Sequence, residues 1–376
     1  MISSRRKGII PTADSTGPRA VTRSAESGGI ERALVVGLGS IGLRHARLLR
    51  ELLPGVELVA LRHDASKIGG SSGVDRSFYT IEEALRARPQ IAVIASPATR
   101  HLDAALPLAQ AGVHLLIEKP IAADVEGVAE LIDVCAARGV VLMTGYNLRF
   151  LSSLRTFREL LSGGRVGRVL SVRAEVGQYL PAWRPSADYR AGVSASSSLG
   201  GGVLLELSHD IDYLRWLFGE IEWVSAIQRK QSALDIDVDD TAHLTFGFAS
   251  ADASAPLVAN LNMDFIRHDA CRTCTAIGET GTLRWDARHG AVDVYDEGST
   301  DWASLFVEEP ERDVSYRAQW LHFLSCIAGE ARPLVSGEDG LAALSVVAAC
   351  RESSRSGMVV PVNTERLRHA PAVVPT

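Results

Sequence analysis

The stretch Ala33-Leu-Val-Val-Gly37-Leu-Gly39-Ser-Ile-Gly42 decides the fold of the first part of the chain. Four apolar residues without a polar interruption are typical of a strand that is covered on both faces. The glycines then follow a G-x-G-x-x-G spacing where helical periodicity begins with Ser40 and Ile41. In such a turn the glycines permit the tight bend, the approach of a pyrophosphate and close packing of helix on strand. The sequence therefore predicts a dinucleotide site at Gly37, Gly39, Ser40, Ile41 and Gly42.

Strands and helices alternate around this turn. The expected strands are residues 33–36, 57–61, 91–95, 114–117 and 140–143. The expected helices are residues 41–53, a segment capped by Thr80 and Glu83 that stops before Pro89, and residues 124–138. Alternation of this kind is typical of a parallel, doubly wound sheet. We therefore expect an α/β fold with a dinucleotide-binding (Rossmann) domain over residues 31–150.

The end of the second strand is expected to read the adenosine ribose. An acidic residue about 20 residues after the glycines would favour NAD by accepting a hydrogen bond from the ribose 2′-hydroxyl. This chain has Arg62 there, with Asp64 two residues later. A guanidinium binds phosphate oxygens well, so Arg62 favours NADP, although Asp64 could still turn inward and Arg62 could be a solvated loop charge. The cofactor is therefore NAD or NADP, with a slight preference for NADP.

Two further segments follow parallel strands at the edge where ligands bind in such sheets. Ser96, Pro97 and His101 come after the strand over residues 91–95 and are candidate cofactor contacts; a helix cap for Ser96 and a surface role for His101 are the alternatives. Glu118 and Lys119 come after the strand over residues 114–117. An ammonium held there could bind a substrate oxygen beside the nicotinamide and stabilise developing charge, whereas a plain surface lysine is the alternative.

The pattern changes after residue 150, where several strand-like runs follow one another without intervening helices. They cover residues 169–176, 223–228, 242–248, 257–263, 271–277 and 282–285. Runs of this kind favour a largely antiparallel sheet. We expect a second α/β domain for substrate binding and oligomerisation over residues 151–362. Residues 1–30 are expected to be a disordered arm and residues 363–376 a tail.

A helix expected over residues 203–217 carries a polar stripe. Glu206, His209 and Asp212 are spaced three apart and share one face, with Tyr213 beside them. A histidine flanked by carboxylates has the parts of a general base. A solvated charged face is the alternative interpretation of this segment.

Composition excludes several classes of function. The net charge of −6 gives no basic excess for nucleic acid, and no apolar run approaches the length needed to span a bilayer. The five cysteines and the lack of a signal peptide favour the cytoplasm. Cys271 and Cys274 lie in an expected strand, where residues three apart point to opposite faces, so we expect no metal site.

Together these segments resemble the Gfo/Idh/MocA (glucose–fructose oxidoreductase / inositol dehydrogenase) family from about residue 33 to 362. The matching segments are Gly37 to Gly42, Ser96-Pro97 to His101, Glu118-Lys119-Pro120, Gly145-Tyr-Asn147-Leu-Arg149-Phe150 and Gly200-Gly-Gly202 to His209-x-x-Asp212. The resemblance implies a nucleotide-binding domain joined to an α/β domain with a large, open, mostly antiparallel sheet. It also implies homodimers or homotetramers assembled through that sheet.

The resemblance further implies roles for individual residues. Lys119 matches the motif lysine and His209 the catalytic histidine of the family. Asp212, Asn147 and Arg149 match residues that line the sugar pocket, and we expect Tyr179 and Tyr213 to join them. Many members carry an acid four residues before the histidine, but here that position is Leu205 and the acid is Glu206. Glu206 is therefore expected to replace it as the partner of the histidine.

The resulting hypothesis is a dehydrogenase that moves a hydride between a nicotinamide and a carbon of a sugar, amino sugar, sugar nucleotide or cyclitol. One alternative is a non-catalytic sensor that binds the dinucleotide, although a sensor would need neither Lys119 nor His209. Another is an imine or enone reductase, which would need no histidine base.

Overall fold

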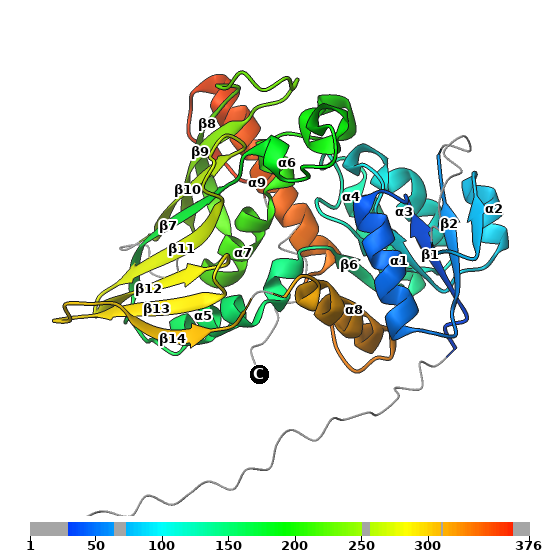
Figure 1. Cartoon of the computed structure of the whole chain (residues 1–376), viewed down its shortest axis with the longest axis horizontal. Helices are drawn as coiled ribbons and strands as arrows, with labels where there is room; N and C mark the ends of the chain where they lie inside the picture. The colour runs from blue at the N-terminus through cyan, green and yellow to red at the C-terminus, as the bar shows by residue number, and fades with distance from the viewer. Residues whose placement is uncertain (1–28, 64–72, 250–255, 310, 364–376) are drawn as a thin grey trace, which may run out of the picture.

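The computed structural model describes residues 29–63, 73–249, 256–309 and 311–363 (Figure 1). Most of the expected arm over residues 1–30, most of the expected tail over residues 363–376 and the expected ribose contact Asp64 lie outside the described residues. The chain forms two sheets, each with its own helices, that lie on opposite sides of a central group of helices.

The first sheet is parallel, as the alternation of strands and helices predicts. It contains β1 (Arg32–Val36), β2 (Glu57–Leu61), β3 (Arg76–Phe78), β4 (Ile91–Ile94), β5 (His114–Ile117) and β6 (Leu142–Thr144). The strand order is β3-β2-β1-β4-β5-β6, and every pairing is parallel. The edge strand β3 was not expected, because its three residues contain no apolar run.

Helices cover both faces of this sheet, which confirms the doubly wound architecture. They are α1 (Ser40–Leu52), α2 (Ile81–Arg86), α3 (His101–Gln110) and α4 (Val128–Arg138). Alternate residues of β1 face opposite ways: Ala33 and Val35 join the core formed with α1, whereas Leu34 and Val36 join the core formed with α3 and α4. The expected capping box of α2 is present, with Thr80 accepting a hydrogen bond from the backbone N–H of Glu83.

The second sheet is large and mostly antiparallel, as expected. It contains β7 (Val169–Gly177), β8 (Ile221–Arg229), β9 (Thr241–Phe248), β10 (Val258–Asp264), β11 (Cys271–Gly278), β12 (Gly281–Asp286), β13 (Ala291–Asp296), β14 (Ala303–Val307) and β15 (Val360–Pro361). The order is β14-β13-β12-β11-β7-β10-β9-β8-β15, and only β7 and β10 pair in parallel among these strands of the described chain. Strands β13, β14 and β15 were not expected. Both Cys271 and Cys274 are free, with Cys274 buried and Cys271 only partly so.

The helix expected over residues 203–217 is broken into α6 (Val203–Glu206) and α7 (His209–Phe218). The side chain of Ser208 donates a hydrogen bond to the carbonyl oxygen of Leu205, 2.9 Å away, and so competes with the helical backbone pattern. The break places His209 in the first turn of a new helix.

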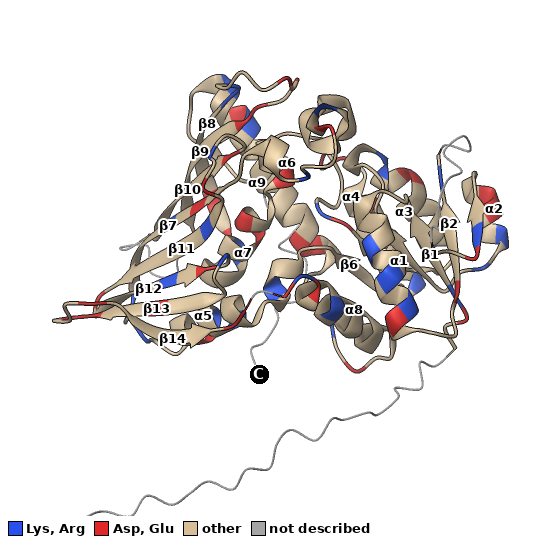
Figure 2. Cartoon of the chain, in the orientation of Figure 1, with Lys and Arg blue, Asp and Glu red and all other residues tan. Residues whose placement is uncertain are grey.

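The remaining helices connect the two sheets. They are α5 (Ser152–Ser162), α8 (Val314–Ile327) and α9 (Gly337–Ser356). Trp320 and Phe323 of α8 pack into the core between α1 and the first sheet, although α8 follows the second sheet in the chain. Helix α9 contacts α4 and β6 on one side and β8 on the other. Charged residues of both signs are distributed over both domains (Figure 2). No helix within the described ranges is long and apolar enough to cross a membrane.

Candidate active site

A cavity of about 670 Å³ lies between the two domains. It is lined by the glycine turn before α1, by the carboxyl ends of β4 and β5, by α6 and α7, and by the ends of β7 and β11. Eleven of the residues that we expected at the site line this one cavity: Gly37, Gly39, Ser40, Ile41, Ser96, Pro97, His101, Glu118, Lys119, Glu206 and His209.

The glycine turn has the geometry needed for a dinucleotide. A Cβ atom at Gly37 would lie 2.9 Å from the backbone nitrogen of Ser96, and one at Gly42 would lie 1.9 Å from the carbonyl oxygen of Gly37. A Cβ atom at Gly39 would meet nothing within 4 Å among the described atoms. The close packing therefore needs glycine at positions 37 and 42, whereas the open space beside Gly39 allows a pyrophosphate to approach the backbone.

The start of α1 is also suited to an anion. No side chain of the described residues caps α1, and its first turn contains no acidic residue. Its N–H groups therefore face the cavity with a partial positive charge and no competing carboxylate. The hydroxyl oxygen of Ser96 is buried beside this turn without a hydrogen-bond partner in the described part of the chain. These features fit the expected dinucleotide.

His101 links two segments of the cavity wall. Its Nε2 atom lies 2.8 Å from the carbonyl oxygen of Ser96, and its Nδ1 atom lies 3.3 Å from that of Ile121. The ring is buried, which lowers its pKa below 6.5 despite these carbonyl groups. His101 thus holds the loop after β4 against the segment that follows Lys119.

Lys119 reaches across the cavity to the second domain. Its Nζ atom donates a hydrogen bond to the backbone carbonyl oxygen of Glu206 over 2.7 Å. The residue lies just beyond β5, where the sequence placed it, and its side chain is partly exposed. This contact brings the ammonium group beside the start of α7.

A buried chain of hydrogen bonds stands behind Lys119. The indole N–H of Trp320 donates a hydrogen bond to Nδ1 of His45 over 2.8 Å. Because Nδ1 accepts, the ring proton lies on Nε2, which donates to the carboxylate of Glu118 over 2.7 Å. Burial raises the pKa of Glu118, but the bond to His45 and the charge of Lys119 together hold it below 4.5. Sequence analysis missed His45 because no motif distinguishes it from the other polar residues of α1.

His209 lies on the opposite wall. Burial lowers its pKa well below 6.5, and the nearby positive charges of Lys119 and Arg272 lower it further. The imidazole is therefore neutral at pH 7. Its Nδ1 atom is buried without a hydrogen-bond partner in the described structure, and the ring packs edge-on against Tyr146.

Glu206 lines the cavity but is not the partner of His209. Its carboxylate accepts a hydrogen bond from the hydroxyl group of Ser194 over 2.7 Å, whereas Nδ1 of His209 has no bond to it. The expected pairing is wrong because the helix breaks between the two residues, so the spacing on a continuous helix does not apply.

Asp212 and Arg149 lie outside the cavity and bind each other. The carboxylate of Asp212 accepts two hydrogen bonds from Arg149, at 2.9 and 2.6 Å, and both side chains are almost fully buried. Arg149 also contacts Asp339 and the carbonyl oxygen of Leu334. The structure does not support the expected contact of this pair with substrate hydroxyls, because these polar groups are already satisfied.

Three other expected substrate contacts also lie outside the cavity. Asn147 is buried and donates to the hydroxyl oxygen of Ser315 over 2.8 Å, and Tyr213 is fully buried against Trp285. Tyr179 stacks on His268 instead of facing the cavity.

At the end of β2, the residue that lines the cavity is not the predicted one. Arg62 does not line the cavity, whereas its neighbour His63 does. The backbone N–H of Arg62 donates to the carbonyl oxygen of Phe78 in β3 over 2.9 Å. This pairing with the unexpected edge strand continues the sheet past β2, and no cavity contact of Arg62 supports the preference for NADP.

Several cavity residues were not among the individual residues predicted for the site. They are Gln178, Trp183, Arg184, Arg272, Arg288 and Tyr316. Arg272 is held by Asp210, whose Oδ2 atom accepts a hydrogen bond from Nε of Arg272 over 3.2 Å. Burial raises the pKa of Asp210 to about 6, although the charge of Arg272 opposes this effect. These residues come from four separate segments that only the fold brings together.

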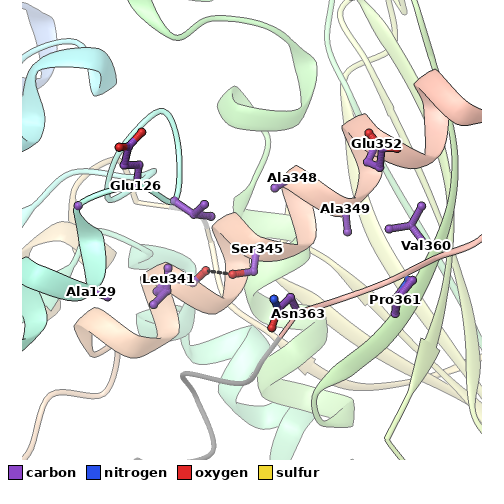
Figure 3. A pocket seen from close by; sticks show the side chains of 12 residues that line it. Glu126, Ala129, Leu341, Ser345, Ala348, Ala349, Glu352, Val360, Pro361 and Asn363 are labelled. Atoms are coloured by element: carbon purple, nitrogen blue, oxygen red, sulfur yellow. Dashed lines mark hydrogen bonds between the residues drawn. The ribbon is translucent and has the colours of Figure 1, made fainter.

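A second cavity, of about 580 Å³, lies between the segment before α4 and one side of α9 (Figure 3). Leu341, Ala348 and Ala349 of α9 face it, and Ser345 donates its hydroxyl group to the carbonyl oxygen of Leu341 over 2.8 Å. None of the expected site residues lines this space. No group of three or more histidine, cysteine or acidic side chains in the described ranges is arranged to hold a metal ion.

Comparison with known proteins identifies the family. Residues 31–146 match the description "Oxidoreductase family, NAD-binding Rossmann fold", and residues 158–363 match "Oxidoreductase family, C-terminal alpha/beta domain". A 1,5-anhydro-D-fructose reductase of Ensifer adhaerens is 27% identical over 82% of this chain and 92% of its own length. Inositol 2-dehydrogenase 3 of Saccharopolyspora erythraea is 25% identical over 88% of this chain and 95% of its own length.

A solved structure shares the fold. Levoglucosan dehydrogenase in complex with NADH superposes with a TM-score of 0.77 at 20% sequence identity, covering 88% of this chain and 99% of its own. The two family descriptions, one for each part of this chain, agree in order with the architecture described above. The chain therefore belongs to the Gfo/Idh/MocA oxidoreductase family, with an NAD-binding Rossmann domain followed by the C-terminal α/β domain of that family.

Proposed function

We propose that this protein is an NAD-dependent dehydrogenase that interconverts a secondary hydroxyl group and a ketone on a sugar-like molecule. One observation carries the proposal: Lys119 of the first domain and His209 of the second line the same cavity as the glycine turn. The relatives named above act on an anhydrosugar and on inositol, which supports a polyhydroxylated substrate.

His209 is the proposed general base. Because Nδ1 is buried while the residue is only partly so, Nε2 is the ring nitrogen proposed to take the hydroxyl proton. A neutral imidazole can accept that proton at pH 7. Oxidation of the carbon also releases a hydride, which bound NAD⁺ would accept, so that the O–H and C–H bonds break as the C=O bond forms.

Lys119 is proposed to hold the reacting oxygen. Its ammonium group is fixed by the carbonyl of Glu206 and can donate a further hydrogen bond to a substrate oxygen. Charge builds up on that oxygen as its proton leaves, and a nearby cation stabilises it. Glu118 is proposed to position Lys119 through the adjacent backbone, where its carboxylate accepts from the Lys119 N–H over 3.3 Å.

The test is oxidation of a panel of cyclitols, anhydrosugars and aldoses, followed by absorbance of reduced nicotinamide. We expect turnover with at least one substrate, and we expect His209→Ala to reduce kcat by about 10²–10⁴-fold while NADH still binds. Full turnover by the His209→Ala variant would remove the assigned base. NADH binding without turnover by any member of the panel would instead favour a sensor.

The choice between NAD and NADP is a finer proposal. Arg62 directly precedes the cavity residue His63, and a guanidinium binds phosphate oxygens well. We expect NADPH to bind, and Arg62→Gln to weaken NADPH more than NADH. Equal loss for both cofactors would contradict a role for Arg62 in reading the ribose.

We also propose that copies of this chain assemble through the second sheet. The protein is proposed to act in the cytoplasm. Exposed residues Arg173, Ile227, His243, Asn260 and Asn262 line a shallow hollow of about 410 Å³ on the sheet face. Ile227 is 57% exposed, and its burial between two copies of the chain would remove apolar surface from water. Light scattering should therefore give a dimer or tetramer, and Ile227→Asp should shift it towards the monomer.

A further inference from the structure

The lining of the cavity carries more positive charge than the proposed chemistry uses, because that chemistry needs only Lys119. The lining contains four basic residues, Lys119, Arg184, Arg272 and Arg288, and two acidic residues, Glu118 and Glu206. Both carboxylates already accept a hydrogen bond, Glu118 from His45 and Glu206 from Ser194. The whole chain, by contrast, has a net charge of −6. A cleft whose sign opposes that of the molecule concentrates ligands of negative charge.

Arg272 is the best-placed of these cations. It lies near the start of β11, and its Nε atom donates to Asp210, the fully buried residue directly after His209. No described group accepts a hydrogen bond from its two terminal nitrogens, and its side chain is 21% exposed. Asp210 therefore orients the guanidinium while leaving two parallel N–H groups available at the cavity wall.

The position of Arg272 relates it to the reacting centre. Arg272 and His209 line the same cavity, and Arg272 is bonded to Asp210, the residue that directly follows His209. The guanidinium charge also helps to lower the pKa of His209. The backbone N–H of Ala287 donates to the carbonyl oxygen of Arg272 over 3.0 Å, which brings the next residue, Arg288, to the same wall. A ligand held by Arg272 would thus lie on the substrate side of the cavity, opposite the glycine turn of the first domain.

We infer that the substrate carries an oxyanion, a carboxylate or a phosphate, near the reacting carbon, and that Arg272 binds it. This inference rests on the proposed function and names the substrate class of the same site. Two parallel N–H groups match the two oxygens of a carboxylate or phosphate, whereas a neutral sugar would leave the two terminal nitrogens of Arg272 without a charged acceptor. Uronic acids and sugar phosphates both present this chemistry.

The experiment measures binding to the NADH-loaded protein by calorimetry. The probes are D-glucose, D-glucuronate and D-glucose 6-phosphate, which share one ring and differ in charge. We expect one of the two anions to bind at least about tenfold more tightly than glucose, and the better anion identifies the group. Arg272→Gln should remove this preference, and Arg272→Lys, which keeps the charge but loses the fork, should reduce it. Arg86→Met, at an exposed arginine of α2 outside the cavity, should leave it unchanged.

The failures of the two proposals are distinguishable. If NADH binds but neither anion binds more tightly than glucose, or if Arg272→Gln keeps the preference, this inference is overturned and the dehydrogenase proposal stands. If NADH does not bind to the wild-type protein, both are overturned. Retention of the NADH affinity and thermal midpoint in Arg272→Gln and Arg272→Lys shows that a lost or reduced preference is not a loss of fold.

Discussion

The ammonium nitrogen of Lys119 lies 2.7 Å from the backbone carbonyl oxygen of Glu206, a hydrogen bond that joins the first domain to the second across the cavity. Lys119 is the only lysine among the described residues that line the cavity. Glu206 lies three residues before His209, which begins α7, so the bond holds the ammonium group near the start of that helix. The chemistry proposed for this protein depends on this contact, because it fixes the ammonium group beside the cavity.

Lys119→Met should therefore reduce kcat by about 10²–10³-fold, because the cation beside the reacting oxygen is lost. NADH affinity should change little, since the glycine turn is untouched. Steady-state kinetics and NADH fluorescence measure the two effects. The matched control is Lys230→Met, at an exposed lysine that contacts only the carbonyl of Ser232 among the described groups. A normal kcat for the Lys119 variant would contradict its assigned role.

The pH dependence of the reaction should reflect the environment of His209. An ordinary histidine would be half protonated at pH 6.5, but burial and two cations lower the pKa of His209 well below that value. The base therefore stays neutral at pH 6.5, and the acid limb of kcat/KM that belongs to His209 should lie well below that pH. Arg272→Gln removes one of the two cations, so this limb should move towards higher pH. An NMR titration of His209 with an inflection at 6.5 in the wild-type protein would be inconsistent with this environment.

The lowered pKa of His209 should also make the folded protein less stable in acid. Because the unfolded chain binds a proton at His209 more readily than the folded protein, acidification from pH 6.5 lowers the free energy of unfolding. His209→Asn should weaken this dependence. Urea unfolding at pH 7.5 and 5.5 gives the comparison, and an unchanged pH slope in the variant would contradict it.

The pair Arg149 and Asp212 should prove structural. Asp212→Asn leaves a buried guanidinium with a weaker partner and should lower the free energy of unfolding by about 3 kcal/mol or more. The KM for substrate should stay near its wild-type value, because neither side chain lines the cavity. Urea unfolding and kinetics at low temperature separate the two effects. A raised KM with unchanged stability would restore the substrate role that the resemblance implied.

Two glycines of the turn should fail in different ways when replaced by alanine. Gly42→Ala would place a Cβ atom 1.9 Å from the carbonyl oxygen of Gly37, so the variant should be unstable. Gly39→Ala meets no described atom within 4 Å, so it should fold normally but bind NADH at least about tenfold more weakly. Thermal midpoints and NADH titrations check the pair. Undiminished NADH binding by the Gly39 variant would exclude a pyrophosphate at that point.

The hydrogen bonds behind Lys119 offer a test of positioning. His45→Leu leaves the buried carboxylate of Glu118 without its partner and should cost about 1–3 kcal/mol of stability. It should also reduce kcat with little change in KM. Trp320→Phe removes only the N–H that His45 accepts and should have the same effects in smaller measure. Loss of stability with unchanged kcat in both variants would show that His45 does not position Lys119.

Local patterns predicted those parts of the molecule that depend on neighbouring residues. The parallel strands of the first sheet and the glycine turn follow from apolar runs and from glycine spacing, and the capping box of α2 lies within four residues. The short strands β3 and β15 and the break between α6 and α7 could not be predicted, because they depend on distant pairing and on the side chain of Ser208.

By itself, the sequence determined the two-domain order, the nucleotide turn and the two residues, Lys119 and His209, that now share a cavity. The tertiary structure alone decided which polar residues face that cavity. Asp212 and Arg149 carry the residue types of a substrate site but satisfy each other in the core, whereas Arg272 carries no motif yet lines the cavity. His45 carries no motif either, yet it bonds the cavity residue Glu118 from behind. The reason is physical: a polar group buried by folding takes its nearest complementary partner, and only the packed chain determines which partner is near.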